Sequence, residues 1–192
     1  SAEIIRIVKY SKNWSRISDC KIYGSNTTAP FNAGSLRMIE LDGKLYVYTC
    51  HEMYADSNNL NHQANMLFTV DESTMKTTDS MYEVSNLQNG YVSHSFNQFI
   101  ATDGAYIYRV DHSESNEMTM QGKYLSVNGI TLSKYSKSAS STNVAVTVPV
   151  KFDIHSGNYT GATIGGFEVG SGNCIIAYTK DISSSCKSRN AY

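Results

Sequence analysis

The histidines are the side chains of this sequence best suited to chemistry near neutral pH, and four of the five stand at the ends of expected strands. His51 is followed by Glu52, and His112 is preceded by Asp111. A neutral imidazole beside a carboxylate can bind zinc, manganese or iron, and it can act as a general acid or base. The candidate catalytic residues are therefore His51, His94 and His112, and the candidate ligands of a divalent metal are these three together with Glu52.

Polar and aromatic residues near these histidines indicate a second kind of site, which would bind a ligand without reacting with it. Asparagine and glutamine side chains supply adaptable hydrogen bonds, and tyrosines that alternate along a strand could stack on sugar rings. The same tyrosines could instead pack between neighbouring sheets, where each buries a large area. The expected binding residues are His62, Gln63, Asn97, Gln98, Tyr48 and Tyr108.

A structural role is the competing interpretation of the histidines. A histidine at the end of a strand can hydrogen-bond a carbonyl group of a neighbouring sheet, and duplication of a repeat preserves the residue type without any catalytic need. One expected repeat copy has Lys180 where the other two have histidine, so the site would not be symmetric. Whether the chain is an enzyme therefore stays open.

An internal repeat identifies the elements that must position these side chains. Residues 34–51 recur as residues 95–112, with the Asp-Gly pair and the final histidine each 61 residues apart. Asp-Gly between two alternating apolar runs favours a β-hairpin with a tight turn, because such turns need positive φ. A weaker third copy spans residues 164–178, with Ser171-Gly172 at its turn.

A second hairpin type alternates with the first. Its copies are expected at residues 4–10 with 16–22, at 66–70 with the strand from 75 onward, and from residue 130. The letters KYSK recur at 9–12 and 134–137, in matching places of two of these hairpins. Loops rich in serine, asparagine and threonine are expected at 24–33, 55–63, 85–93, 113–122 and 136–143.

These hairpins predict an all-β chain and a single repeat domain over residues 1–192. Two hairpins in roughly 60 residues are the content of one four-stranded β-propeller blade, so the chain carries about three blades' worth of strands. Closed propellers have about 4–8 blades. We therefore expect either self-association or further chain segments to close the ring. A β-sandwich, which also uses short strands and tight turns, is the alternative architecture.

The composition excludes several function classes. The 16 basic and 17 acidic side chains are scattered, which argues against a nucleic-acid partner. No apolar run approaches the roughly 20 residues needed to cross a bilayer, and no cleavable signal peptide is visible. Of the four cysteines, Cys174 and Cys186 are best spaced for a disulfide, and buried or free thiols are the alternative.

Three stretches carry a family resemblance: TCHEMY (49–54), NHQAN (61–65) and GYVSHSFNQ (90–98). They resemble the propeller-type repeats of large bacterial secreted or cell-surface proteins of unknown function. The resemblance covers about residues 1–135 and implies an extracellular or cell-surface location, with no assigned activity.

We therefore expect a non-catalytic β-propeller module that binds a glycan or a protein partner through its loop face. The alternative is a polysaccharide hydrolase or lyase whose histidines line the propeller axis, with or without a divalent metal. Fold alone does not decide between them.

Overall fold

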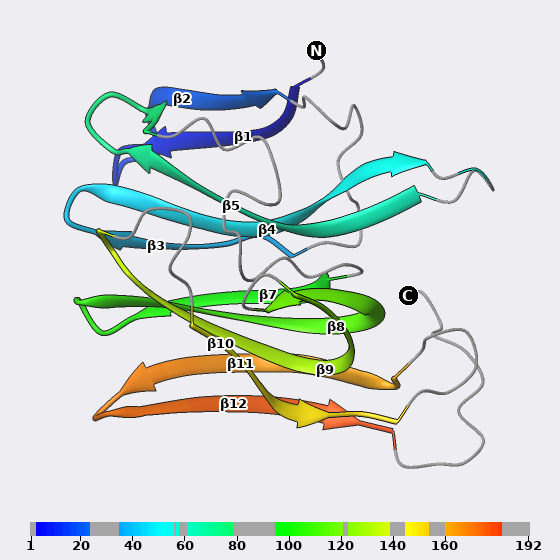
Figure 1. The fold of residues 1–192 in the computed structure, drawn as a ribbon. Coiled ribbons are helices and arrows are strands. Elements are labelled where there is room, and N and C mark those ends of the chain that lie inside the picture. The colour runs from blue at the N-terminus through cyan, green and yellow to red at the C-terminus, as the bar shows by residue number, and fades with distance from the viewer. Residues whose placement is uncertain are drawn as a thin grey trace.

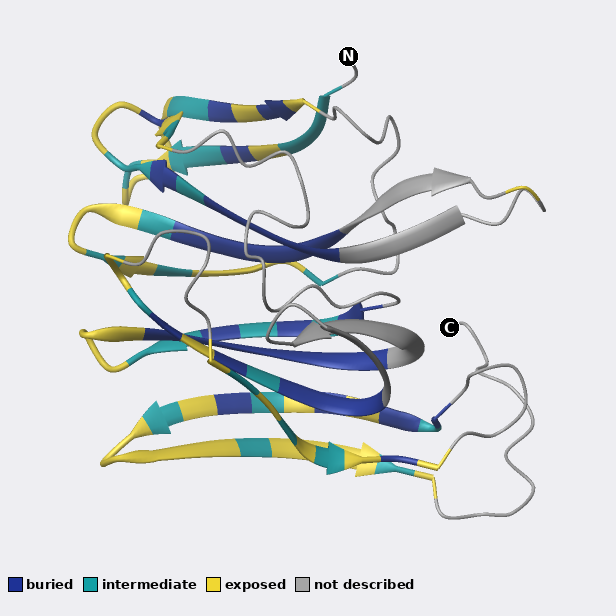
Figure 2. Ribbon diagram, in the orientation of Figure 1, coloured by how far each residue is buried: buried dark blue, intermediate teal, exposed yellow. Residues whose placement is uncertain are grey.

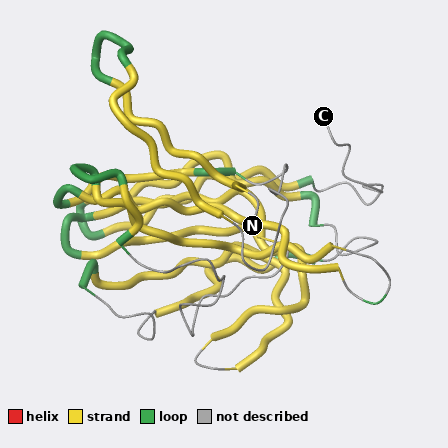
Figure 3. Tube along the Cα trace, turned by 90° about the horizontal axis from the view of Figure 1, so that it is seen from above, coloured by secondary structure: helices red, strands yellow, loops and turns green. Residues whose placement is uncertain are grey.

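The computed structural model describes residues 3–23, 35–55, 57, 61–78, 95–120, 123–138, 145–153 and 160–181, with the backbone alone at 51–55, 61–64, 114–120 and 123–127. Every regular element in this part of the chain is a β-strand, and Figure 3 shows no helix there. The predicted all-β class is confirmed. The described residues accordingly hold no helix long and apolar enough to cross a membrane.

The described strands form four antiparallel sheets. The first contains β1 (Glu3–Tyr10) and β2 (Arg16–Tyr23), and the second contains β3 (Arg37–Leu41), β4 (Lys44–Ala55), β5 (Asn61–Asp71) and β6 (Lys76–Thr77). The third contains β7 (Ser95–Thr102), β8 (Tyr106–Met120), β9 (Lys123–Ser136) and β10 (Ala145–Lys151), and the fourth contains β11 (Ala162–Gly170) and β12 (Asn173–Lys180).

The four sheets stack face to face in chain order, as Figure 1 shows from the blue first sheet to the orange last one. In both four-stranded sheets, consecutive strands are neighbours, so each is a simple meander. The predicted alternation of two hairpin types is confirmed, because each full sheet joins one hairpin of the first type to one of the second. The first sheet contains only a hairpin of the second type, and the last contains only one of the first type.

Tight turns form where the sequence predicted them. Asp42 and Gly43 have φ of 53° and 75°, and Ser171 and Gly172 have φ of 51° and 78°. Positive φ at both central residues is the type I′ geometry that matches the twist of the two flanking strands. These turns lie on the same side of the molecule, at the left in Figure 1.

The turn of the second repeat copy lies one residue later than the alignment of the two repeats predicts. In the first hairpin Leu41 pairs with Lys44. In the second, the N–H of Asp103 donates to the carbonyl oxygen of Tyr106 at 3.4 Å, so Gly104 and Ala105 form the turn. The structural counterpart of Lys44 is therefore Tyr106 rather than Ala105, an offset of 62 instead of 61 residues.

The displacement arises at the side chain of Asp103. Its Oδ1 accepts hydrogen bonds from the backbone N–H groups of Ala105 at 3.0 Å and Tyr106 at 2.7 Å, an arrangement by which Asp favours a turn immediately after itself. Because neighbouring residues of a strand face opposite sides, a shift of one residue places each side chain of the second copy on the face opposite the one that the sequence alignment predicts. The counterpart of His112 is Cys50, so the predicted equivalence of His51 and His112 is wrong.

Among the described residues, three apolar cores lie in series between the four sheets. Ile7 and Ile22 pack on Val47 and Phe68 in the first core. Tyr46 and Leu67 pack on Ile100, Ile107 and Tyr135 in the second. Tyr108, Val110 and Ile130 pack on Ile164 and Phe167 in the third. Burial of each such side chain contributes about 1.5–3 kcal/mol, so packing between sheets dominates stability. A two-sheet sandwich would have one core instead of three.

Three of the predicted loops contain strand residues, and the loop expected at 136–143 contains only one, Ser136 at the end of β9. Pairing of β8 with β9 continues to Met120 opposite Lys123, so most of the loop expected at 113–122 is strand. The loop expected at 55–63 contains the start of β5, because Ala55 pairs with Asn61. A polar composition does not prevent a strand when an adjacent strand satisfies its backbone groups.

Candidate functional site

Several predicted site residues lie at one end of the second sheet. His51 and Glu52 of β4 are directly opposite Ala64 and Gln63 of β5, and His62 is the second residue of that strand. Their side chains are outside the described part of the structure, and His94 lies outside it altogether. The catalytic, metal-binding and ligand-binding roles assigned to these residues stay predictions.

His112, by contrast, is fully buried between the third and fourth sheets. Its Nε2 lies 2.6 Å from Oγ1 of Thr160. Its ring stands 6.4 Å from that of Phe96 and 5.8 Å from that of Phe152, measured between centroids. Within the described residues, no three His, Cys, Asp or Glu side chains are arranged to hold a metal ion. The surroundings of His112 are those of a packed, hydrogen-bonded interior histidine.

Asn97 and Gln98 connect neighbouring segments of the interior. Asn97 has φ of 50°, and its Oδ1 accepts a hydrogen bond from the backbone N–H of Ile164 in β11 at 3.3 Å. Gln98 is fully buried, donates to Oγ of Ser95 at 2.7 Å and accepts from the backbone N–H of Ser35 at 3.2 Å. Both side chains are therefore engaged by the protein itself.

Tyr48 belongs to a buried polar network between the second and third sheets. Its hydroxyl donates to the carboxylate of Asp111 and accepts from Nδ2 of Asn65 at 3.0 Å. Ser95 donates to the other carboxylate oxygen of Asp111. The guanidinium of Arg109 lies 4.9 Å from the centroid of the Tyr48 ring. Tyr48, Asp111 and Ser95 are fully buried, and Asn65 and Arg109 are almost so.

Burial controls the ionisation of this network. Burial raises the pKa of Asp111, which the hydrogen bonds from Ser95 and Tyr48 and the charge of Arg109 oppose. Burial also raises the pKa of the Cys50 thiol, so that thiol is protonated and unreactive near neutral pH. A network of this kind, closed to solvent, fixes how two sheets pack and offers no access to a substrate.

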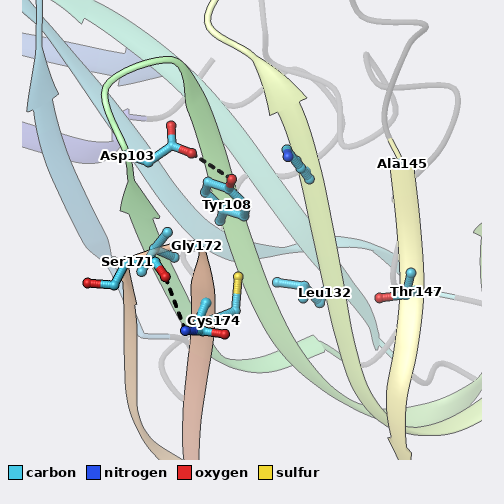
Figure 4. Close-up of a pocket in the computed structure, with 12 residues that line it drawn as sticks. Asp103, Tyr108, Leu132, Ala145, Thr147, Ser171, Gly172 and Cys174 are labelled. Carbon is cyan, nitrogen blue, oxygen red and sulfur yellow. Dashed lines mark hydrogen bonds between the residues drawn. The ribbon is translucent and has the colours of Figure 1, made fainter.

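Among the described residues, an open concave pocket of about 480 Å³ lies between the third and fourth sheets. Strands β9 and β10 form one wall through Leu132, Lys134 and Thr147. The β11–β12 turn and Cys174 form another, opposite Leu132 and Thr147 in Figure 4. Asp103 and Tyr108 lie at the end of the pocket that is near the turn between β7 and β8. Of the predicted binding residues described with side chains, Tyr108 lines this pocket.

Charged groups at the pocket are already paired. The Tyr108 hydroxyl donates to Oδ2 of Asp103 at 2.7 Å. Backbone hydrogen bonds, foremost that from Tyr106, lower the pKa of Asp103. The ammonium of Lys134 lies 4.0 Å from the centroid of the Tyr106 ring and 5.4 Å from that of Tyr108. Hydrogen bonding to Tyr108 raises the pKa of Lys134, which keeps the amine charged.

The pocket adjoins an open sheet edge. Strand β12 pairs with β11 on one side, and among the described strands nothing pairs with its other side. Most of β12 is exposed, as Figure 2 shows, and Ile175 on its outer face is 65% exposed. Cys174 is a free thiol that is exposed, whereas Cys20 and Cys50 are free thiols that are buried. Cys186 lies outside the described residues. Burial nonetheless raises the pKa of Cys174, so it is a poor nucleophile.

The sequence did not point to this pocket, because its walls come from three hairpins that are distant along the chain. One signal was available. Lys134, which lines the pocket, belongs to the KYSK letters shared with residues 9–12.

Comparison of the chain with models of protein families, with curated proteins and with solved structures finds no match.

Proposed function

We propose that this chain is a β-propeller-type module without catalytic activity, and that it binds a protein partner by accepting an extended strand at the open edge of β12. The propeller architecture is supported by the order of the sheets: full four-stranded meanders stack in chain order and are flanked by two half-sheets. The chain then contributes three blades' worth of strands.

The observation that carries the proposal is the position of the pocket beside an unpaired strand edge. A partner strand that adds to such an edge gains main-chain hydrogen bonds, and its alternate side chains can enter adjacent pockets. The turn between β11 and β12 closes on the pair Gly170 and Asn173. Because hydrogen-bonded and non-bonded pairs alternate, the N–H groups of Cys174 and Ile176 point toward the open edge.

The chemistry of the pocket favours a peptide over a glycan. Sugar binding usually needs an open aromatic face, whereas the aromatic residue that lines this pocket, Tyr108, has the Lys134 ammonium 5.4 Å from its ring centroid. Tyr108 is only 7% exposed. The remaining walls, such as Leu132 and Thr147, suit an aliphatic or aromatic side chain.

The alternative function, a polysaccharide hydrolase or lyase, gains no support from the candidate residue whose side chain is described. His112 is 0% exposed and packs against two phenylalanines. A general acid or base must reach the proton that it transfers.

The test is a selection of random decapeptides displayed on phage against the immobilised chain, with a glycan array probed in parallel. We expect enrichment of extended peptides with alternating apolar residues, and no glycan signal. The variant Cys174→Pro removes an edge donor and should lose the selected peptides, whereas Thr163→Ala, exposed on the neighbouring strand β11, should retain them. Glycan binding, or peptide binding that survives Cys174→Pro, would contradict the proposal.

A further inference from the structure

The two half-sheets are complementary halves of one four-stranded sheet. The hairpin β11–β12 occupies the place that β3–β4 and β7–β8 take in the full sheets, and β1–β2 occupies the place of β5–β6 and β9–β10. In the full sheets β4 pairs with β5, and β8 pairs with β9. Among the described strands, the corresponding partners β12 and β1 pair with nothing on these edges.

We propose that β12 of one copy of this chain pairs antiparallel with β1 of a second copy, which completes the sheet β11–β12–β1–β2 from two molecules. This inference rests on the proposed function, since it names the partner strand that the edge of β12 receives.

The full sheets fix the register of this pairing. Lys44 pairs with Asp71 and Leu45 with Val70. The counterpart of Lys44 is Asn173, because each closes its hairpin turn. The carbonyl oxygen of Asp71 accepts from the N–H of Met75, and that of Ser11 accepts from the N–H of Trp14, so Ser11 is the counterpart of Asp71. It follows that Asn173 faces Ser11 and Cys174 faces Tyr10.

The third sheet gives the same register independently. There Tyr106, the counterpart of Asn173, pairs with Ser136. Ser136 ends the letters Lys-Tyr-Ser at 134–136, which recur at 9–11. Ser136 thus corresponds to Ser11, and the residue before it, Tyr135, corresponds to Tyr10.

Residues of the half-sheets are more exposed than their counterparts in the full sheets, as expected if the half-sheets lack a partner. Tyr135 is 6% exposed in a full sheet, whereas its counterpart Tyr10 is 52% exposed. Tyr46 is 6% exposed, whereas its counterpart Ile175 is 65% exposed. Met38 of β3, opposite Val47 and therefore on the face turned to the first half-sheet, is 53% exposed. Tyr10, Ile175 and Met38 thus line the space that the missing half-sheets would fill.

In this pairing, strand β1 of the second copy would lie against the pocket described above. In the full sheets the residues of β9 that correspond to Tyr10 and Val8 turn toward the preceding sheet, as Tyr135 does in the second core. Tyr10 and Val8 of the second copy would likewise turn toward Leu132 and Lys134. Two copies joined at both junctions contain six four-stranded sheets, which is within the range of about 4–8 that closes a propeller. Closure would remove the open edges.

The test is a disulfide cross-link that reports the register. Residues opposite each other on antiparallel strands have Cα atoms about 4.5–5.5 Å apart, which suits a disulfide. In a background with Cys186→Ser, the variant Tyr10→Cys should give a disulfide-linked dimer in a glutathione redox buffer, and peptide mapping should find position 10 joined to Cys174. The variant Lys9→Cys, whose side chain lies on the other face of β1, should give at least tenfold less of its own cross-link to Cys174.

A second measurement does not depend on the folding of a variant. Sedimentation velocity of the unmodified chain at micromolar concentration should show a species of twice the chain's mass. A monomer at every concentration, with no link between positions 10 and 174, would overturn the inference. If displayed peptides still bound such a monomer, the proposed strand-accepting function would stand and only the identity of the partner would be wrong.

Discussion

The substitution Tyr48→Phe tests whether the polar network between the second and third sheets stabilises the fold. The side chain is fully buried, and its hydroxyl is the only group that the substitution removes. That hydroxyl donates to Asp111 and accepts from Asn65 at 3.0 Å. Loss of a buried hydrogen-bonding partner costs about 1–3 kcal/mol. We therefore expect the free energy of unfolding to fall by about 2 kcal/mol.

Urea unfolding at a fixed protein concentration provides the assay. With a slope of about 2 kcal/mol per molar urea, the midpoint should fall by about 1 M while the slope is unchanged. The matched control is Tyr23→Phe, because Tyr23 is 41% exposed and its substitution should change stability by less than about 0.5 kcal/mol. Equal midpoints for Tyr48→Phe and Tyr23→Phe would refute the stabilising role of the network.

Three further predictions concern packing, pH and thiol access. Gly129→Ala should destabilise the fold by about 1–3 kcal/mol in the same assay, because a Cβ there would lie 2.2 Å from the carbonyl oxygen of Val150, whereas Gly165→Ala, with no atom within 4 Å, should be near neutral. Hydrogen bonds, that from Ser73 first, lower the pKa of Asp71 from 3.8 to about 2, so the ionised form stabilises the fold above pH 3.8 and this stabilisation is lost as the pH falls through about 2. Thermal melts from pH 5 to pH 2 should therefore show a smaller loss of stability for Asp71→Asn than for the unmodified chain, and parallel curves would contradict the assignment. Mass spectrometry after brief treatment with a maleimide should find Cys20 and Cys50 labelled only after unfolding; labelling of Cys50 in the native state would show that its burial is wrong.

Sequence patterns predicted the hairpins well because the relevant forces are local. Asp42-Gly43 and Ser171-Gly172 adopt the positive φ that their residue types favour, and apolar residues near each turn, such as Leu45 and Phe167, pack in a core. The alternation of hairpin types followed from repeat spacing alone, and the sheets combine the hairpins in that order.

The register of the second repeat copy could not be predicted from matching letters. Asp103 and Asp42 are both followed by glycine, yet Asp42 lies within its turn, whereas Asp103 precedes its turn and directly follows β7. The choice depends on side-chain hydrogen bonds that two identical letters do not distinguish. Its effect reaches the candidate site, because it places His112 in the slot of Cys50.

The pocket and the buried network could not be predicted from the sequence either, for a different reason. Tyr48 and Asp111 meet across two sheets, and the pocket brings together Lys134, Thr147 and Cys174 from three strands. Such contacts depend on the stacking of whole sheets. A histidine pattern along the chain contains no information on which side chains that stacking buries.

The central claim, that β12 and β1 of two copies complete one sheet, is tested most directly by amide hydrogen exchange of Ile176. Its N–H points to the open edge of β12, at the position that Val47 occupies in β4. At micromolar protein concentration the account predicts slow exchange at Ile176, comparable to that at Val47, and faster exchange on dilution. Exchange at Ile176 at the rate of an unstructured peptide at every concentration, with the rest of the fold protected, would contradict it.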